Sequence, residues 1–352
     1  MTTPPRGERR RMKDFDLGSL VRPNILALKP YSSARDEFTG EEGIFLDANE
    51  NPYGKKNRYP DPRQRKLKKA LSERNGIPTK HILIGNGSDE VIDLIYRVFC
   101  EPSRDRVIIC PPTYGMYEVS ANINNVEVIE VPLTSEFELN IDEILSHPAK
   151  CVFVCSPNNP TGNRLKNVER LLNEFQGIVV VDEAYIDFCT DPGFASKVQE
   201  YPNLIVMRTF SKAWALASAR VGIAYANEEI IGLMSKTKPP YNVSALNQLA
   251  ALDALSKPQK FEYRLGVILE QRSLLEEELL KLPMVRKIYP SDANFLLVEV
   301  DNANDLYRHL VEKKVIVRNR HSVVPGCIRI TVGTPDENQT LLEALKNYNK
   351  KI

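Results

Sequence analysis

One lysine stands where two cationic side chains can meet an anionic ligand. Lys212 follows the apolar run Leu204–Met207, and Arg220 comes eight residues later at the start of the next apolar run. Taken alone, a lysine here is most simply a solvated surface residue. Two cations at one crevice instead favour an anionic ligand, and the second cation lowers the pKa of the lysine. A partly deprotonated amine is the nucleophile that Schiff-base chemistry requires.

A carboxylate ends another apolar run. Asp182 directly follows Val179-Val180-Val181, where an unpaired charge would be costly to bury. Opposite a protonated ring nitrogen, the carboxylate forms a buried ion pair that keeps the nitrogen charged, and a pyridine ring then becomes an electron sink. Tyr114 could stack on such a ring. Tyr185 and Asn159 could hydrogen-bond its phenolic oxygen.

A third group is suited to a phosphate. Gly87-Ser88-Asp89 opens a predicted helix, and the free N–H groups and positive dipole end of a helix bind anions. A serine N-cap after a glycine turn explains this loop equally well when it is taken alone. No Gly-Lys-Ser/Thr follows, so the loop is not a P-loop. Because the Asp89 carboxylate repels phosphate, we expect a phosphate to meet the backbone and Ser88.

These side chains follow short apolar runs that alternate with helical patterns, such as Asp89–Cys100 and Val168–Phe175. The predicted strands are His81–Ile84, Val107–Cys110, Val126–Val131, Cys151–Cys155, Ile178–Val181, Leu204–Met207 and Val221–Ala224. Several are apolar throughout, as strands buried on both faces are. The order predicts an α/β fold, a three-layer α/β/α domain with a mostly parallel sheet. Ligands bind at the carboxyl ends of the strands in such sheets, which is where the polar residues gather.

The C-terminal part predicts a smaller α+β domain. Its predicted elements are a long helix Phe261–Leu282, a strand Phe295–Val300, a helix Ala303–Lys313, short strands Val315–Arg318 and Cys327–Val332, and a helix Asp336–Tyr348. We expect the long helix to act as the hinge between domains. We assign residues 1–14 to a disordered basic tail, 45–255 to the large domain, and 15–44 with 256–352 to the small domain.

Composition excludes several classes of protein. The 352 residues include 47 Lys and Arg against 46 Asp and Glu, so no basic excess favours nucleic acid or an anionic membrane. No apolar run approaches the roughly 20 residues of a membrane-spanning helix, and no secretory signal is evident. The four histidines form no ligand pair, so no metal site is predicted. We therefore expect a cytoplasmic protein whose six cysteines are reduced.

Together these motifs resemble those of the fold-type I pyridoxal-phosphate enzymes, aminotransferase classes I and II, over about residues 23–350. The matching motifs are Gly87-Ser88-Asp89, Asn158-Asn159-Pro160-Thr161-Gly162, Asp182-Glu183-Ala184-Tyr185, and Ser211-Lys212 with Arg220. Other segments are similar to the histidinol-phosphate aminotransferase subgroup, namely Pro30–Arg35, Leu46–Pro52, Arg58–Pro62 and Gly326–Thr331. The resemblance implies pyridoxal 5'-phosphate as cofactor and a homodimer as the active unit.

The resemblance also implies residue roles. Lys212 holds the cofactor covalently and moves a proton, Asp182 pairs with the ring nitrogen, and Tyr185 bonds the phenolic oxygen. The other implied cofactor-binding residues are Gly87, Ser88, Asp89, Tyr114, Asn159, Thr209, Ser211 and Arg220, with Tyr59 contributed from the second subunit. The implied substrate-binding residues are Tyr31, Asn49, Arg318 and Arg329. Among them, Arg329 clamps the anionic group of the substrate through its guanidinium fork.

The reaction implied is the transfer of an amino group from L-glutamate to imidazole-acetol phosphate, which gives L-histidinol phosphate and 2-oxoglutarate in histidine biosynthesis. A threonine-phosphate decarboxylase and an aromatic-amino-acid aminotransferase are alternatives with the same cofactor. A non-catalytic regulator would need an appended DNA-binding domain, for which the N-terminus has no room, and a nicotinamide-binding protein would need Gly-x-Gly-x-x-Gly. The chain departs from the family pattern at Trp214, Ser218 and Ala219, and its Arg318-to-Arg329 segment is shorter than in some relatives.

Overall fold

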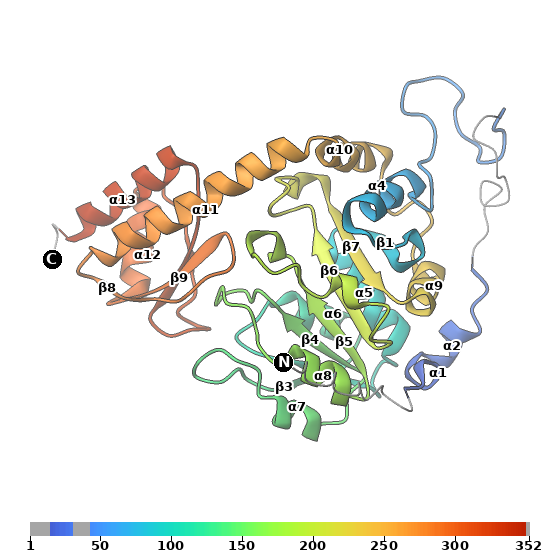
Figure 1. Cartoon of the computed structure of the whole chain (residues 1–352), viewed down its shortest axis with the longest axis horizontal. Coiled ribbons are helices and arrows are strands. Elements are labelled where there is room, and N and C mark those ends of the chain that lie inside the picture. Colours follow the sequence, from blue (N-terminus) through green and yellow to red (C-terminus); the bar gives the residue numbers. More distant parts are fainter. Residues whose placement is uncertain (1–14, 31–42, 350–352) are drawn as a thin grey trace, which may run out of the picture.

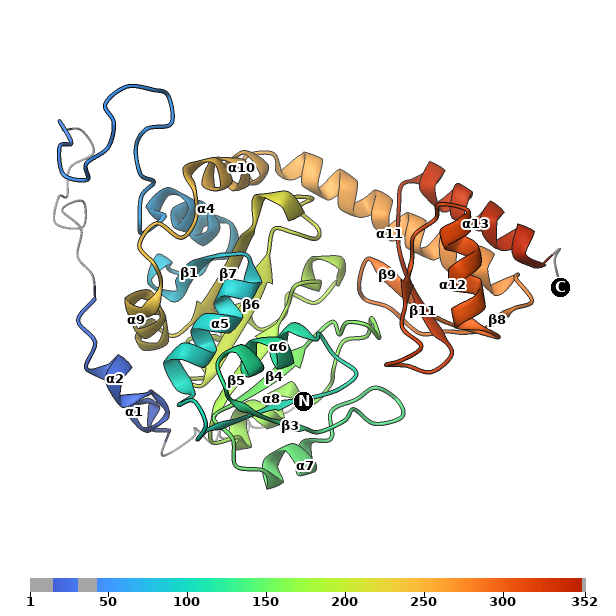
Figure 2. The same ribbon diagram turned by 180° about the vertical axis from the view of Figure 1, so that it is seen from behind.

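The computed structural model describes residues 15–30 and 43–349, which form two units joined by a long helix (Figures 1 and 2). The larger unit is built on a seven-stranded sheet and the smaller on a four-stranded antiparallel sheet. The helix α11 (Pro258–Leu280) runs from one unit into the other. No helix in the described ranges is long and apolar enough to cross a bilayer.

The large sheet has the order β1-β7-β6-β5-β4-β2-β3. Its strands are β1 (Ile82–Asn86), β2 (Arg106–Ile109), β3 (Glu127–Glu130), β4 (Cys151–Cys155), β5 (Ile178–Asp182), β6 (Leu204–Thr209) and β7 (Val221–Ala226). Only β7 runs antiparallel to its neighbours, so the predicted α/β fold with a mostly parallel sheet is confirmed. Each strand predicted for this sheet is present, with ends that differ by at most two residues.

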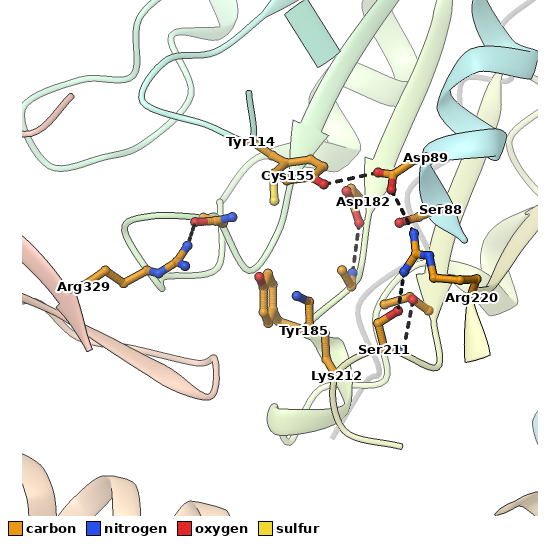
Figure 3. A pocket seen from close by; sticks show the side chains of 13 residues that line it. Ser88, Asp89, Tyr114, Cys155, Asp182, Tyr185, Ser211, Lys212, Arg220 and Arg329 are labelled. Atoms are coloured by element: carbon orange, nitrogen blue, oxygen red, sulfur yellow. Dashed lines mark hydrogen bonds and ion pairs between the residues drawn. The ribbon is translucent and has the colours of Figure 1, made fainter. Parts of the chain in front are cut away.

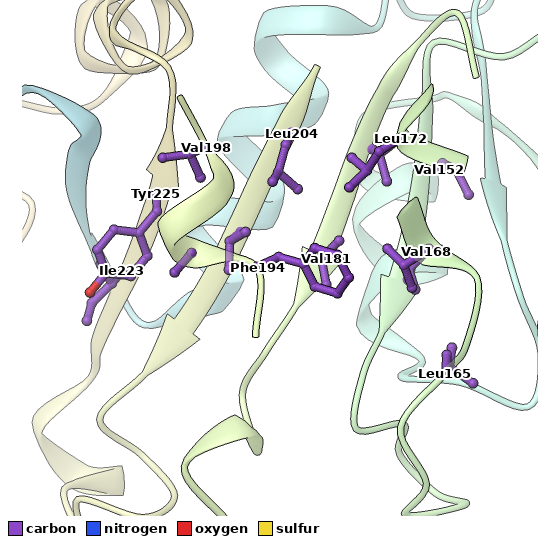
Figure 4. Close-up of a cluster of buried hydrophobic side chains, with 14 of the residues drawn as sticks. Val152, Leu165, Val168, Leu172, Val181, Phe194, Val198, Leu204, Ile223 and Tyr225 are labelled. Atoms are coloured by element: carbon purple, nitrogen blue, oxygen red, sulfur yellow. The ribbon is translucent and has the colours of Figure 1, made fainter. Parts of the chain in front are cut away.

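Both faces of this sheet are covered, which explains the continuous apolar strands. Val179 and Val181 point into one core cluster, shown in Figure 4, while Val180 points into the cluster on the opposite face. The first face is covered by α4 (Arg65–Asn75), α7 (Ile141–Ser146), α8 (Val168–Glu174) and α10 (Ala245–Leu255). The second is covered by α5 (Ser88–Phe99), α6 (Met116–Ile123) and α9 (Glu228–Thr237). Short 3-10 turns are η1 (Thr79–His81), η2 (Ile186–Phe188), η3 (Ala195–Lys197) and η4 (Ala217–Ala219).

The small sheet has the order β10-β11-β9-β8. Its strands are β8 (Val285–Ile288), β9 (Phe295–Val300), β10 (Arg318–Asn319) and β11 (Cys327–Thr331), and its helices are α11, α12 (Ala303–Glu312) and α13 (Pro335–Asn349). These helices pack on one face of the sheet, against side chains such as Leu296 and Ile328. The other face presents Phe295 and Arg329 toward the large unit, where Phe295 contacts Tyr185.

The N-terminal segment departs from the predicted domain division. Within residues 15–30, α1 (Leu17–Leu20) and α2 (Pro23–Leu26) pack on the large unit, because Ile25 joins the core cluster under α5 and α9. The Lys150 amine also donates to the carbonyl of Ser19 at 3.0 Å. The assignment of residues 15–30 to the small domain is therefore wrong. The tail 1–14 and the segment 31–42 lie outside the described residues.

Candidate active site

A pocket of about 210 Å³ opens where the carboxyl ends of the large sheet face the small unit (Figure 3). Its walls are Ser88, Asp89, Tyr114, Cys155, Asn159, Asp182, Ala184, Tyr185, Thr209, Ser211, Lys212, Arg220 and Arg329. All except Cys155 and Ala184 were candidate residues from the sequence. Arg329 comes from the small unit, so both units build the pocket.

One end of the pocket is a helix terminus packed against a strand. Gly87 precedes α5 with φ +78°, no side chain caps the terminus, and Ser88 is the first helical residue. The serine N-cap alternative is therefore wrong, and the first-turn N–H groups remain available to a ligand. A Cβ on Gly222 of β7 would overlap the backbone of Gly87 and Ser88. The missing side chain at Gly222 lets this loop rest directly on the sheet.

Arg220 completes this end of the pocket. It adopts a left-handed conformation (φ +50°), and its guanidinium lies 3.0 Å from the Asp89 carboxylate and 3.5 Å from the Ser211 hydroxyl. Asp89 also accepts a hydrogen bond from the Tyr114 hydroxyl at 3.2 Å. Thr209 Oγ1 accepts from the Ser211 N–H at 3.1 Å. The guanidinium, hydroxyls and uncapped amides fit a phosphate monoester.

Replacing Gly222 with alanine should weaken this cradle. The new methyl group must push the Gly87–Ser88 backbone away from β7, at about 1–3 kcal/mol of stability. Displaced donors should raise the Kd for pyridoxal phosphate by about tenfold, since hydrogen bonds to charged groups are strong. Fluorescence titration of the cofactor-free protein measures this constant. Gly232→Ala is the matched control, because a Cβ there meets nothing within 4 Å; equal Kd values for the two variants would contradict the cradle.

A buried carboxylate forms the floor of the pocket. Asp182 is 3% exposed and accepts hydrogen bonds from the Tyr117 hydroxyl at 2.7 Å and the Ala184 N–H at 3.0 Å. Burial raises the pKa of this carboxyl, and these two donors oppose the rise. No ion pair within the described part of the chain reaches Asp182. The protonated nitrogen of a pyridine ring would supply the missing cation, so the floor fits the expected cofactor.

Tyr117 is a residue that the sequence analysis missed. It lies in α6 with its ring stacked on Phe153, 5.0 Å between centroids, and only its hydroxyl serves Asp182. In the sequence it is one more apolar position of a helix. Its role depends on how α6 packs against the sheet, which no local motif reports.

Lys212 projects into the same space as Asp182 (Figure 3). Its amine lies 5.4 Å from the centroid of the Tyr185 ring. Partial desolvation and the positive charge of Arg329 lower the pKa of this amine, while Asp182 opposes the shift. The sequence argument attributed the lowered pKa to Arg220, whose effect is smaller than that of Arg329.

The turn that carries Lys212 is anchored to α11. The Ala215 N–H donates to the Lys212 carbonyl at 3.0 Å, which closes the turn. Trp214 then stacks on Phe261 of α11, with 4.0 Å between ring centroids and 22° between planes. The guanidinium of Arg74 covers the indole at 4.7 Å. The lysine is thus held by packing on the helix that also carries the small unit.

Arg329 lies at the end of the pocket opposite Arg220 (Figure 3). Its Nη1 donates to the side-chain oxygen of Asn159, and its guanidinium covers the Phe295 ring at 5.1 Å. Its Nε is buried and has no hydrogen-bond partner among the described residues. A carboxylate or phosphate oxygen of a substrate can supply that partner.

Five candidate residues lie outside the pocket lining, and one of them, Gly87, directly precedes the lining residue Ser88. Asn49 is exposed, and Tyr59 stacks on Tyr241 at 4.5 Å. Both belong to a segment that extends beyond α4, away from the pocket (Figure 1). Arg318 is exposed on β10, opposite Arg329 in the strand register. Tyr31 falls outside the described residues.

Comparison with known proteins agrees with this geometry. A family model described as aminotransferase class I and II matches residues 45–345. A histidinol-phosphate aminotransferase of Cytophaga hutchinsonii is 53% identical over 95% of this chain and 99% of its own. The crystal structure of the histidinol-phosphate aminotransferase from Clostridium acetobutylicum superposes with a TM-score of 0.77 at 25% identity, covering 84% of this chain and 91% of that one. The crystal structure of L-threonine-O-3-phosphate decarboxylase from Porphyromonas gingivalis superposes with a TM-score of 0.73 at 25% identity. The superposition covers 83% of this chain and 91% of that one. The chain belongs to the histidinol-phosphate aminotransferase family, within the class I and II aminotransferases.

Proposed function

We propose that this enzyme uses pyridoxal phosphate to transfer an amino group from L-glutamate to imidazole-acetol phosphate, giving L-histidinol phosphate and 2-oxoglutarate. The observation that carries the proposal is the pairing of Lys212 and the buried Asp182 across a pocket that ends in an uncapped helix terminus. When bound, the cofactor supplies a carbonyl that accepts the amino group and a ring that withdraws electrons from the substrate Cα.

Each residue of the pocket has a role that follows from its position. Ser88, the first amides of α5 and Arg220 hold the cofactor phosphate, and Tyr114 covers the ring. Asp182 keeps the ring nitrogen protonated. Lys212 attaches the cofactor and moves the proton at the substrate Cα, a task that its lowered pKa favours.

Arg329 binds the anionic group of both substrates. The α-carboxylate of glutamate and the phosphate of the ketone take the same place, because a guanidinium fork pairs with either group. The unpartnered Nε and the bond from Nη1 to Asn159 support this role, since the fork is oriented and retains a free donor. Asn159 was expected to bond the phenolic oxygen of the cofactor. Its amide nitrogen can still do so while its oxygen accepts from Arg329.

The absorbance spectrum of the cofactor-loaded enzyme tests the reaction. L-glutamate should convert the spectrum to that of the amine form of the cofactor and release 2-oxoglutarate. L-histidinol phosphate should produce the same spectrum and release imidazole-acetol phosphate. Adding 2-oxoglutarate should restore the original spectrum. Release of carbon dioxide from L-threonine phosphate, with no 2-oxoglutarate formed from glutamate, would instead identify a decarboxylase.

We also propose that the active unit is a homodimer. Apolar side chains are exposed in the segment that carries Tyr59, with Ile44, Leu46 and Tyr53 at 92%, 88% and 85% exposure. Leu246 and Leu249 of α10 are also exposed. Apolar patches of this kind mark interfaces. In the dimer, Tyr59 reaches the cofactor phosphate held by the partner subunit.

Replacing Tyr59 with phenylalanine should then raise the Kd for pyridoxal phosphate by about tenfold, since one hydrogen bond to a charged group is lost. Dimer mass should not change, because the ring and its stack on Tyr241 remain. Sedimentation and cofactor titration measure the two quantities. Tyr263→Phe, a change of the same kind at an exposed site on α11, is the control. A monomer at micromolar concentration would refute the shared site.

A further inference from the structure

Three guanidinium groups share one face of the small sheet. Arg318 and Arg329 are direct partners in the β10–β11 register. The next step of the ladder continues beyond β10, because the Arg320 N–H donates to the Cys327 carbonyl at 3.0 Å. Side chains alternate between the faces of a strand, so Arg320 lies on the same face as Arg318 and Arg329.

This face is the one turned toward the pocket. The opposite face carries apolar side chains such as Ile330, which pack against α11, α12 and α13. On the arginine face, Leu297 packs beside Cys327, and Phe295 contacts Tyr185 of the large unit. Arg329 itself lines the pocket.

The three arginines on this face have no carboxylate partner among the described residues. Within residues 15–30 and 43–349, no ion pair joins any of the three arginines to a carboxylate, and Arg320 Nε and Arg329 Nε are both buried without a hydrogen-bond partner. Burial and the charges of Arg329 and Arg318 lower the pKa of Arg320. The acid on this face, Glu299 opposite Cys327, accepts from the Tyr289 hydroxyl at 3.2 Å. Such a cluster is suited to an anion of more than one charge.

We propose that Arg320 is a specificity-determining residue, which binds the phosphate of imidazole-acetol phosphate and L-histidinol phosphate and does little for glutamate. The inference rests on the proposed function. A phosphate monoester carries about −1.5 to −2 charges at pH 7 and three acceptor oxygens. A carboxylate carries one charge and is satisfied by a single guanidinium fork, which Arg329 provides. The third cation therefore distinguishes the two substrates that share one pocket.

Arg320→Gln tests the assignment, because glutamine keeps a polar side chain and removes the charge. We expect the KM for L-histidinol phosphate to rise by about tenfold or more, and the KM for glutamate to change by less than about threefold. Arg320→Lys should recover part of the loss. The penalty should shrink below about pH 6, where the phosphate monoester takes up its second proton. A purely structural role would not produce this pH dependence.

Arg308→Gln is the matched control, since it removes an exposed arginine from α12, on the covered side of the same unit. Equal KM values for the Arg320 and Arg308 variants would overturn the inference, and so would an equal loss for both substrates of the Arg320 variant. Inorganic phosphate provides a further readout as a competitive inhibitor, with an inhibition constant that should rise in Arg320→Gln alone. If the unaltered enzyme did not accept L-histidinol phosphate at all, the proposed function would fail instead.

Discussion

Replacement of Lys212 by alanine should reduce multiple turnover on the order of 10⁴-fold, the upper range for loss of a positioned proton-transfer group. The variant loses both the amine that attaches the cofactor and the group that moves the proton at the substrate Cα. The fold should survive, because Lys212 forms no ion pair within the described residues and extends into an open pocket. Steady-state rates, with a thermal melt of the same preparation, measure both effects.

Two controls separate chemistry from folding. Lys197→Ala removes a partly exposed lysine that pairs with Glu169 on the large unit and should leave turnover near that of the unaltered enzyme. A small primary amine in solution should partly restore Lys212→Ala, since it can replace the lost base within the pocket. Multiple turnover that persists in Lys212→Ala without an added amine would remove the basis of the assignment. Borohydride reduction followed by peptide mapping should label Lys212 in the unaltered enzyme.

Local sequence was sufficient to predict a site residue where its side chain closely follows a buried strand. Asp182 ends β5 and Lys212 comes three residues after β6, so the topology of a parallel sheet brings them to the same edge. The apolar strands themselves could be predicted because helices cover both faces of the sheet. β8 lacks this apolar pattern and was not predicted, because it is a short edge strand whose Arg286 and Lys287 are exposed.

Other features depend on contacts between distant parts of the chain. Tyr117 donates a hydrogen bond to Asp182 only because α6 packs against the face of the large sheet. Ile25 belongs to the core of the large unit only because α2 packs there. The pKa of Lys212 responds chiefly to burial and to Arg329, which reaches the pocket from the small unit. The hairpin register that places Arg320 beside Arg329 is likewise set by pairing between strands.

The second large effect follows from the burial of Asp182. Replacing it with asparagine should slow the half-reaction with glutamate by about 10²–10³-fold, the loss typical of one electrostatic stabiliser in a water-excluded site. The neutral amide no longer keeps the ring nitrogen of the cofactor protonated, so the ring withdraws electrons less well from the substrate Cα. Rapid-mixing absorbance with saturating glutamate measures this step. A half-reaction rate within about threefold of the unaltered enzyme would contradict the role of Asp182.

The same substitution should stabilise the cofactor-free protein at pH 7. Burial raises the pKa of Asp182, so the folded chain binds this proton more tightly than the unfolded chain does. The group contributes stability below its unfolded pKa of about 3.9 and loses that contribution as the pH rises. Asparagine carries no charge to bury, so the Tm of the cofactor-free variant should exceed that of the unaltered protein at pH 7, and the difference should shrink toward pH 4.

Asp187→Asn, at another carboxyl whose pKa is raised by burial but which lies outside the pocket, should slow the half-reaction far less. A Tm that falls at pH 7 while activity persists would mean that Asp182 serves the fold rather than the cofactor.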